Sequence, residues 1–395
     1  MNLVFVSEGQ YPGGSASSNR HLAYAKGLVE LGNKVTFILL APQNNADQSF
    51  TLDGINFICV SVSKSKLKHS SIEWIFSIFR SDRKGEKLIS DITSEEKVDA
   101  VILLDVLVFI LYPFLRFCNK RKIPVFHERT EFPVVYDNHG VLDRLHQKIY
   151  LSQILPRFDG IFVINHALKK YFEEVTNNKI PVSIVNMVVD PSRFASAHVP
   201  KAEASKYLAY CGSMDIEKDG VDILIRSFGK AINESGINKE IYLMLIGDTT
   251  DVIRQNKLNR IIEESNCVKN VILTGSVKRQ RIPELLTNAD ALALARPNSK
   301  QAEGGFPTKL GEYLSTGKPV IITNTGEIGL FLKDGHNAFI AEAGSIDSFS
   351  KKIRQVFDNY NDAIKVGLNG KNLVYNEFNY LHQAKCLSDF IKSII

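Results

Sequence analysis

The chain has 395 residues, which is too long for one ordinary core and suits two domains of roughly 150 to 200 residues each. Hydrophobic residues make up 44% of it and charged residues 23%, ordinary globular values that indicate neither a disordered chain nor a membrane channel. The formal net charge of +5 is modest, and because no nucleic-acid-binding module is recognisable, the sequence argues against nucleic acid as a partner.

The N-terminal sequence MNLVFVSEGQ begins directly with an apolar strand pattern. It has no basic region followed by a long apolar stretch, so we expect no signal peptide and a cytoplasmic location. The five cysteines are widely spaced and odd in number, which favours reduced thiols over a disulfide framework. They form no CxxC pair, so a zinc or redox site has little support.

Short apolar runs rich in β-branched residues alternate with helix-length segments in the first half of the chain. Continuous apolar strands of this kind favour a parallel sheet covered by helices on both faces. The run from Val101 to Leu115 is shorter than the roughly 18 to 20 residues that span a bilayer, so we interpret it as a buried strand followed by a helix. The predicted strands are Leu3–Ser7, Val35–Leu40, Val101–Leu104, Val125–His127 and Ile161–Ile164.

The segment from Lys64 to Lys87 is both basic and apolar. It has seven bases against three acids, a net charge of +4, together with large apolar residues such as Trp74. One interpretation is a surface helix whose apolar side completes the domain core. The other is an interfacial helix on an anionic membrane, which predicts peripheral contact with the inner face of the cell membrane.

The second half repeats the alternation of strands and helices, after a polar, proline-containing stretch that places a linker near residue 200. We therefore expect an α/β fold with two Rossmann-like doubly wound domains facing across a cleft, residues 1–200 and 201–375. A C-terminal amphipathic helix, about residues 376–395, is expected to pack back on the first domain. The predicted strands here are Tyr207–Cys211, Ile241–Ile246, Val271–Leu273, Ala291–Ala295 and Val320–Thr323.

Ligands in open parallel sheets bind beyond the carboxyl ends of the strands, so the loops that follow strands are the candidate sites. After the first strand, Gly13 and Gly14 open a loop in which backbone N–H groups can approach a diphosphate or sugar hydroxyls, next to a helix N-terminus. A simple turn into a capped helix is the alternative, since GxGxxG is absent.

The segment EGGFPTKLGEYLSTGKPVIIT, residues 303–323, is the strongest candidate site. Gly304 and Gly305 free the loop, Pro307 suits the first turn of a helix and Gly317 suits its end. The N–H groups of the first helical residues and the ammonium of Lys309 then form a predicted phosphate site. The phosphate site comprises Thr308, Lys309 and Leu310, and Gly305 and Phe306 are further predicted donor-binding residues.

Glu312 lies one helical turn after Thr308, on roughly the same face. A carboxylate in contact with phosphates would repel them, whereas one turn away it can accept hydrogen bonds from two ribose hydroxyls. A glutamate paired with a lysine on a surface helix is the alternative.

His127 follows an apolar strand and stands in the polar cluster HERTE, where it can donate to a sugar hydroxyl or carry a proton. A structural histidine is the alternative. The motif Asp-x-Asp is absent, so we expect no metal clamp on a diphosphate and no cofactor. Protein cations then have to neutralise the leaving group, and Lys218, Lys309 and Arg296 are the candidates because each follows a predicted strand.

Together these segments resemble the retaining glycosyltransferases of family 4, which have the GT-B fold. The resemblance covers nearly the whole chain. It rests above all on GGFPTKLGEYLSTGKPVI, supported by LAYAKGLVELGNKV, YCGSMDIEKDGVDILI, LIGD and ILTGSV. It implies a donor bound mainly to the C-terminal domain and an acceptor bound mainly to the N-terminal one.

The resemblance also implies roles for particular residues. Glu312 matches the second glutamate of the family's EX7E motif, which holds the ribose, and Lys218 matches a phosphate-binding lysine. His127 matches the active-site histidine near the transferred sugar, and Gly13 and Gly14 match the glycine loop. The sequence departs from the family at two positions: Gly304 stands where the first glutamate is expected, one residue after Glu303, and Ser213 stands where an arginine is usual.

The sequence therefore predicts a metal-independent, retaining hexosyltransferase of bacterial surface-polysaccharide or glycoconjugate biosynthesis. Its partners would be a nucleotide-diphosphate sugar and a glycan or lipid-linked acceptor. Two alternatives remain: a nucleotide-sugar epimerase of similar build, which needs no acceptor, and a degenerate, non-catalytic sugar-nucleotide-binding protein.

Overall fold

The computed structural model describes residues 1–13, 15–41, 43, 49–60, 71–104, 107–133, 140–195, 206–234, 241–248 and 251–395, apart from the side chains of residues 71–82 and 141–142. The chain divides into two compact units. Met1–Val188 and Tyr380–Ile395 form the first, and Val189–Asn379 form the second. The linker predicted near residue 200 lies outside the described residues.

The first unit is built on an eight-stranded sheet with the order β3-β4-β2-β1-β5-β6-β7-β8. Its strands pair in parallel, except that β3 runs antiparallel to β4. The central strands β1, β5, β6 and β7 are buried along their whole length. Burial on both faces explains why β1, β5 and β7 are largely apolar without alternation. The strands are β1 (Asn2–Ser7), β2 (Lys34–Leu39), β3 (Ser49–Leu52), β4 (Ile55–Cys59), β5 (Ala100–Leu103), β6 (Val125–Arg129), β7 (Gly160–Val163) and β8 (Val182–Ile184).

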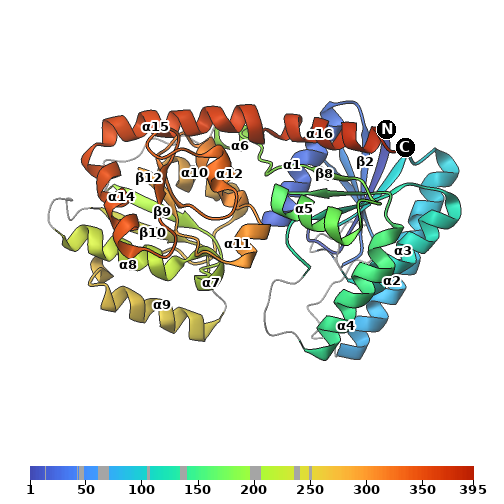
Figure 1. Ribbon diagram of the computed structural model, residues 1–395, viewed down its shortest axis with the longest axis horizontal. Helices are drawn as coiled ribbons and strands as arrows, with labels where there is room; N and C mark the ends of the chain where they lie inside the picture. The colour runs from blue at the N-terminus through green and yellow to red at the C-terminus, as the bar shows by residue number, and fades with distance from the viewer. Residues whose placement is uncertain are drawn as a thin grey trace. The chain divides into compact units, whose positions relative to one another are not determined.

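Helices cover this sheet, and the last helix of the chain is one of them (Figure 1). The helix α16 packs along α1, where Ala384, Leu387 and Ile391 join the same apolar core as Tyr24. The helices of the unit are α1 (Ala16–Glu30), α2 (Ser71–Glu95), α3 (Val108–Arg121), α4 (Val141–Ile149), the π-helix η1 (Tyr150–Ile154), the 3-10 helix η2 (Leu155–Arg157), α5 (His166–Val175) and α16 (Tyr380–Lys392).

The second unit contains a six-stranded sheet with the order β11-β10-β9-β12-β13-β14, in which every pairing is parallel. The strands are β9 (Tyr207–Cys211), β10 (Tyr242–Ile246), β11 (Val271–Leu273), β12 (Ala291–Leu294), β13 (Val320–Thr323) and β14 (Phe339–Ala341). The helices are α6 (Ser192–Ala195), α7 (Ile216–Asp219), α8 (Val221–Asn233), α9 (Val252–Glu264), η3 (Val268–Asn270), η4 (Arg279–Arg281), α10 (Ile282–Thr287), α11 (Lys300–Gly304), α12 (Thr308–Ser315), α13 (Ile328–Phe331), α14 (Ile346–Asp358), α15 (Tyr360–Leu373) and the π-helix η5 (Val374–Phe378).

The predicted fold class, an α/β fold with two parallel-sheet domains, is confirmed. Every strand expected from the sequence is present, and Val101–Leu115 forms β5 and the start of α3. In the described part of the chain, no helix has both the length and the apolar character needed to cross a bilayer.

The order of the strands locates the ligand-binding edge of each sheet. In the first sheet, β2, β3 and β4 lie on one side of β1, and β5 to β8 lie on the other side, so the strand order reverses between β1 and β5. In the second sheet the order reverses in the same way between β9 and β12. Crevices for ligands open at such reversal points, beyond the carboxyl ends of the two strands. The loops that follow β1, β5, β9 and β12 are therefore the places where a site is expected.

Candidate functional site

The loops that carry two of the predicted cations meet at the reversal point of the second sheet. Lys218 lies in α7, after β9, and Arg296 follows β12. The Nε of Arg296 donates to the backbone carbonyl of Lys218 over 3.4 Å. Gly220 (φ +66°) brings the two loops together, because a Cβ at this position would lie 1.9 Å from the carbonyl oxygen of Ala295. The Arg296 side chain is 4% exposed, whereas Lys218 lies on the surface.

The third predicted cation, Lys309, reaches the same loops from α12. Its ammonium forms an ion pair with the carboxylate of Asp219 and lies 5.2 Å from the centre of the Tyr210 ring. The hydroxyl of Tyr210 also donates to Asp219, over 2.7 Å. Burial alone would raise the pKa of Asp219, but the charge and hydrogen bond of Lys309 lower it, with a smaller contribution from Arg296. Lys309 is therefore held at the reversal point by a carboxylate that stays ionised.

Two of the predicted donor-binding residues near the start of α12 are engaged in contacts within the protein. Leu310 is buried and its N–H donates to the carbonyl of Pro307 over 2.9 Å. Phe306 packs against Phe331 and Phe378, with ring centres 5.6 Å and 5.7 Å away. Thr308 is the first residue of α12, and the first N–H groups of a helix have no partner within it. The N–H groups of Thr308 and Lys309 therefore remain the best placed for an anion.

The other predicted donor residues lie around this helix. The carboxylate of Glu312 accepts a hydrogen bond from Nη1 of Arg193, in α6, over 2.8 Å, and both side chains are partly exposed. Glu303 lies exposed on α11, and Gly305 directly follows that helix. Arg193 is a residue that sequence reasoning missed, because it is separated from Glu312 by 119 positions and no motif contains it.

In the first unit, Gly13 lies in the loop between β1 and α1, and Gly14 lies outside the described residues. A Cβ at Gly13 would lie 2.3 Å from the carbonyl oxygen of Gln10, so the loop is closed too tightly for any side chain. Ser15 begins α1 as its N-cap by accepting from the N–H of Ser18 over 3.1 Å. The glycine is therefore needed for the shape of the turn, whatever the loop binds.

His127 is located in the middle of β6 and is fully buried, whereas the sequence suggested that it follows the strand. The difference arises because the polar residues Glu128 and Arg129 continue the strand. Nδ1 of His127 lies 2.9 Å from the carbonyl oxygen of Leu103, so Nδ1 carries a proton that it donates. Burial, and secondarily the charge of Arg129, lowers the pKa of His127 to about 3. The imidazole is therefore neutral at pH 7, and Nε2 is an acceptor with no partner among the described residues.

A buried ionic network next to His127 was not anticipated. The carboxylate of Glu128 lies 2.7 Å from Nε of Arg20 and 2.7 Å from Nε2 of His21. Nδ1 of His21 lies 2.6 Å from the hydroxyl of Tyr11, in the loop that contains Gly13. The network ties that loop and α1 to β6. The polar cluster HERTE drew attention to Glu128 in the sequence. Its partner Arg20 is 108 positions away, and no spacing rule connects the two.

Across the residues that the structure describes, no group of three His, Cys, Asp or Glu side chains is arranged to hold a metal ion.

The second unit is similar to known glycosyltransferases in sequence. Residues 205–359 match the family model described as glycosyl transferases group 1. That range contains Lys218, Arg296, Lys309 and Glu312. The chain is also 21% identical to an uncharacterized glycosyltransferase from Methanocaldococcus jannaschii. The aligned 281 residues cover 70% of this chain and 69% of the relative.

Solved structures extend the likeness to the whole chain. Sucrose-phosphate synthase from Thermosynechococcus elongatus has a TM-score of 0.75 at 13% identity, over 99% of this chain and 98% of that one. Anabaena HepE in complex with UDP and glucose has a TM-score of 0.71 at 12% identity, over 100% of both chains. Identities this low show the fold alone. The comparisons therefore support glycosyltransferase function, with a likeness to group 1 over residues 205–359, in a chain that has the GT-B fold.

Proposed function

We propose that the protein is a retaining glycosyltransferase that moves a sugar from a nucleotide-diphosphate sugar to an acceptor hydroxyl. The observation that carries the proposal is the convergence of Lys309, Arg296 and the Lys218 loop at the reversal point of the second sheet. Basic side chains beyond the carboxyl ends of β9 and β12, one of them held by Asp219, are suited to a diphosphate. The structure of HepE with UDP and glucose supports a donor of this class.

The donor would bind through its phosphates and its ribose. The N–H groups of Thr308 and Lys309 and the Lys309 ammonium bind the diphosphate, and Arg296 and Lys218 approach it from the other side. Glu312 accepts hydrogen bonds from the ribose hydroxyls, a carboxylate for which Arg193 is the partner in the structure. Because Glu312 is one turn away from the start of α12, it recognises the ribose without repelling the phosphates.

The reaction would be driven by positioning and by stabilisation of the leaving group. The acceptor hydroxyl attacks the anomeric carbon from the side on which the diphosphate leaves, the bond to the leaving phosphate oxygen breaks, and that oxygen takes the proton. Configuration is therefore retained. Lysine and arginine, rather than a metal, neutralise the charge that develops on the diphosphate.

The acceptor side of the proposal rests on the first unit. The loop with Gly13 and Gly14 would contact the acceptor or the diphosphate. His127 would accept a hydrogen bond from a sugar hydroxyl through Nε2, since Nδ1 already donates to Leu103. Glu303 would act next to the transferred sugar in place of the missing first glutamate of the motif. The acceptor is a glycan or a lipid-linked glycan of bacterial surface-polysaccharide or glycoconjugate assembly.

The donor site can be tested by binding. We expect one of UDP, GDP and ADP to raise the melting temperature, because a ligand of the folded state stabilises it by mass action. Its 2′-deoxy form should bind about 10- to 100-fold more weakly, since a hydrogen bond to a charged carboxylate is lost. In Glu312→Gln this preference for the ribonucleotide should shrink, while Glu303→Gln on α11 should retain it. If both variants prefer the ribonucleotide over its 2′-deoxy form to the same extent, Glu312 does not bind the ribose.

The reaction itself is tested by product analysis with the nucleotide sugar that binds. Transfer to an acceptor, or slow hydrolysis of the donor, should continue in excess EDTA, and the first product formed should have the anomeric configuration of the donor. A donor converted to another nucleotide sugar without an acceptor would instead indicate an epimerase. Binding without any turnover across a broad acceptor panel would indicate a non-catalytic protein.

We further propose peripheral contact with the inner face of the cell membrane through residues 64–87. Lys64, Lys66 and Lys68 lie outside the described residues, and α2 carries Arg80 and Arg83. The protein should sediment with anionic liposomes at low salt and be released as salt screens the attraction. Neutralising these five bases together should abolish sedimentation, and unchanged sedimentation would assign the segment another purpose.

A further inference from the structure

Three buried polar side chains near the carboxyl end of β6 have atoms without hydrogen-bond partners among the described residues. They are Nε2 of His127, Nε of Arg129 and the hydroxyl of Tyr150. The guanidinium carbon of Arg129 lies 5.3 Å from the centre of the Tyr150 ring, and the rings of His127 and Tyr150 are 5.9 Å apart. The three side chains therefore form one cluster. Tyr150 begins the π-helix η1, and such helical irregularities are frequent at functional sites.

Arg129 is the unusual member of the cluster. Its guanidinium carbon also lies 6.0 Å from the centre of the Phe172 ring, and its Nη2 donates a hydrogen bond to the backbone carbonyl of Glu131 over 3.2 Å. Arg129 is 6% exposed, and within the described residues no carboxylate forms an ion pair with it. A buried guanidinium without a counter-ion is costly. An anionic group of a ligand would compensate for that cost.

An apolar groove begins next to this cluster. The groove has a volume of about 510 Å³ and lies between α3 and the α4–η1 segment, lined by Val108, Phe109, Tyr112, Pro113, Leu145, His146, Ile149, Gln153 and Ile154. The chain connects the two features, because Ile149 directly precedes Tyr150 and Ile154 ends the π-helix that Tyr150 begins. Burial lowers the pKa of His146, Asp143 raises it, and the charge of Arg129 lowers it further. Leu145 is 52% exposed and Tyr112 is 44% exposed, so the groove opens to solvent.

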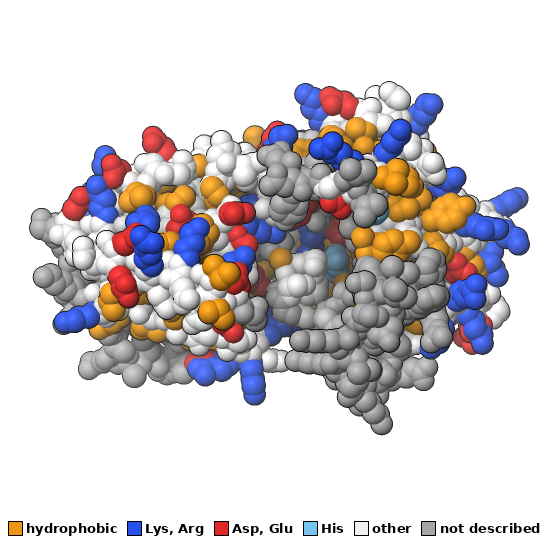
Figure 2. Space-filling view, turned by 90° about the horizontal axis from the view of Figure 1, so that it is seen from below, with side chains coloured by type: hydrophobic (Ala, Val, Ile, Leu, Met, Phe, Trp, Pro, Cys, Tyr) orange, Lys and Arg blue, Asp and Glu red, His pale blue; other side chains and the backbone are white. Residues whose placement is uncertain are grey.

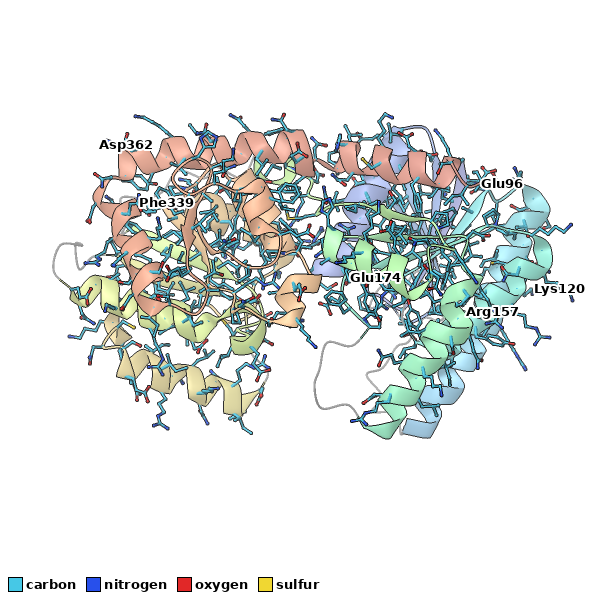
Figure 3. The ribbon with its side chains drawn as sticks, viewed as in Figure 1. Glu96, Lys120, Arg157, Glu174, Phe339 and Asp362 are labelled. Atoms are coloured by element: carbon cyan, nitrogen blue, oxygen red, sulfur yellow. The ribbon has the colours of Figure 1, made fainter. Side chains whose placement is uncertain are left out.

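The charge around the groove favours an anionic amphiphile. The sequence of α3 contains three bases, that of α4 two and that of η2 one, against a single acid, Asp143. Figure 2 shows orange hydrophobic and blue basic side chains next to one another on the half that contains the first unit, and Figure 3 labels Lys120 and Arg157 on the side of α2, α3 and α4. The guanidinium of Arg157 lies 5.8 Å from the centre of the Tyr112 ring, at the wall of the groove.

We propose that this cluster and groove bind a lipid phosphate, with the phosphate on Arg129 and Tyr150 and the hydrocarbon chain in the groove between α3 and α4. The inference rests on the proposed function, because it makes the acceptor a glycan carried by a lipid phosphate. Arg129 supplies a fixed charge that cannot be deprotonated, and Tyr150 donates a hydrogen bond from its hydroxyl. The groove supplies apolar surface whose burial contributes affinity.

The test uses the full chain and three probes: farnesyl phosphate, farnesol and inorganic phosphate, with calorimetry below the concentration at which the lipids aggregate. Farnesyl phosphate should bind at least 10-fold more tightly than farnesol, and phosphate alone should bind more weakly than either. Arg129→Gln should reduce the affinity for farnesyl phosphate to that for farnesol and leave farnesol unaffected. Leu145→Asn should weaken the binding of both lipids. Arg121 is an exposed arginine near the end of α3, and Arg121→Gln should change the affinity for either lipid by less than 2-fold.

A second variant keeps the test decisive if Arg129→Gln does not fold. Tyr150→Phe retains the ring next to the guanidinium and removes the hydroxyl. It should therefore weaken the binding of farnesyl phosphate and leave the binding of farnesol unchanged. Equal affinity for farnesyl phosphate and farnesol, or binding that appears only when the lipid aggregates, would overturn the proposal. The nucleotide-induced shift in melting temperature, measured on the same protein, reports the proposed function separately. A normal shift without lipid discrimination would therefore reject this inference alone.

Discussion

Turnover should fall about 100- to 1,000-fold when Lys309 is replaced by methionine, the range that follows loss of a group that stabilises developing negative charge. The substitution also affects stability, because Asp219 is 4% exposed and loses its ion-pair partner. Breaking such a pair from one side leaves an uncompensated charge and costs about 3 kcal/mol. Steady-state kinetics with the donor that binds, together with urea unfolding, measures the two effects.

The double variant Lys309→Met with Asp219→Asn separates catalysis from stability. Asparagine removes the unpaired charge and can still accept the hydrogen bond that Tyr210 donates over 2.7 Å. We therefore expect most of the lost free energy of unfolding to return while turnover stays low. Recovery of turnover together with stability would mean that Lys309 acts by holding Asp219 and not by neutralising the leaving group.

The elements that could be predicted from the sequence are those whose local pattern decides them. Strands such as β1 and β12 are buried on both faces, so an uninterrupted apolar run is enough to identify them. The strands β3 and β4 alternate between more and less buried residues and pair with each other at the edge of the sheet, and their short polar-containing sequences gave no clear signal. The strands β8 and β14 were also missed. Each has three residues, too few for any periodicity, although the equally short β11 was identified from its apolar sequence.

The candidate site divides in the same way. Lys218, Arg296 and Lys309 each follow a recognisable strand or start a recognisable helix, so their approach to one another follows from the topology of the sheet. Asp219 and Arg193 could not be assigned, because each is defined by a partner that is distant in the chain. The three-dimensional contacts, and not the residue types, give these two their importance. The same holds for the orphaned hydroxyl of Tyr150.

The ionic network around Glu128 leads to the second large effect, a loss of stability of about 3 to 5 kcal/mol at pH 7 in Arg20→Met. Arg20 is 1% exposed. Besides its pairing with Glu128, it donates to the carbonyls of Val185 and Asn186 over 2.6 Å and 2.5 Å. Methionine would leave two acceptors without their donor and a buried carboxylate with fewer partners. Lys169→Met on α5 is the matched control, because its ion pair with Glu173 is well exposed and should contribute less than about 1 kcal/mol.

The loss should also depend on pH with a definite sign. Burial alone would raise the pKa of Glu128, but the charges and hydrogen bonds of His21 and Arg20 outweigh burial and lower it to about 2 from 4.5. A carboxyl whose pKa is depressed on folding contributes stability above its unfolded pKa and loses it as pH falls toward its folded pKa. The difference in the free energy of unfolding between wild type and Arg20→Met, measured with urea, should therefore have its largest value at pH 7 and be clearly smaller at pH 3. A difference that stays constant over this range would mean that Arg20 stabilises the unit by packing and by its bonds to the two carbonyls, and that the charge of Glu128 contributes little.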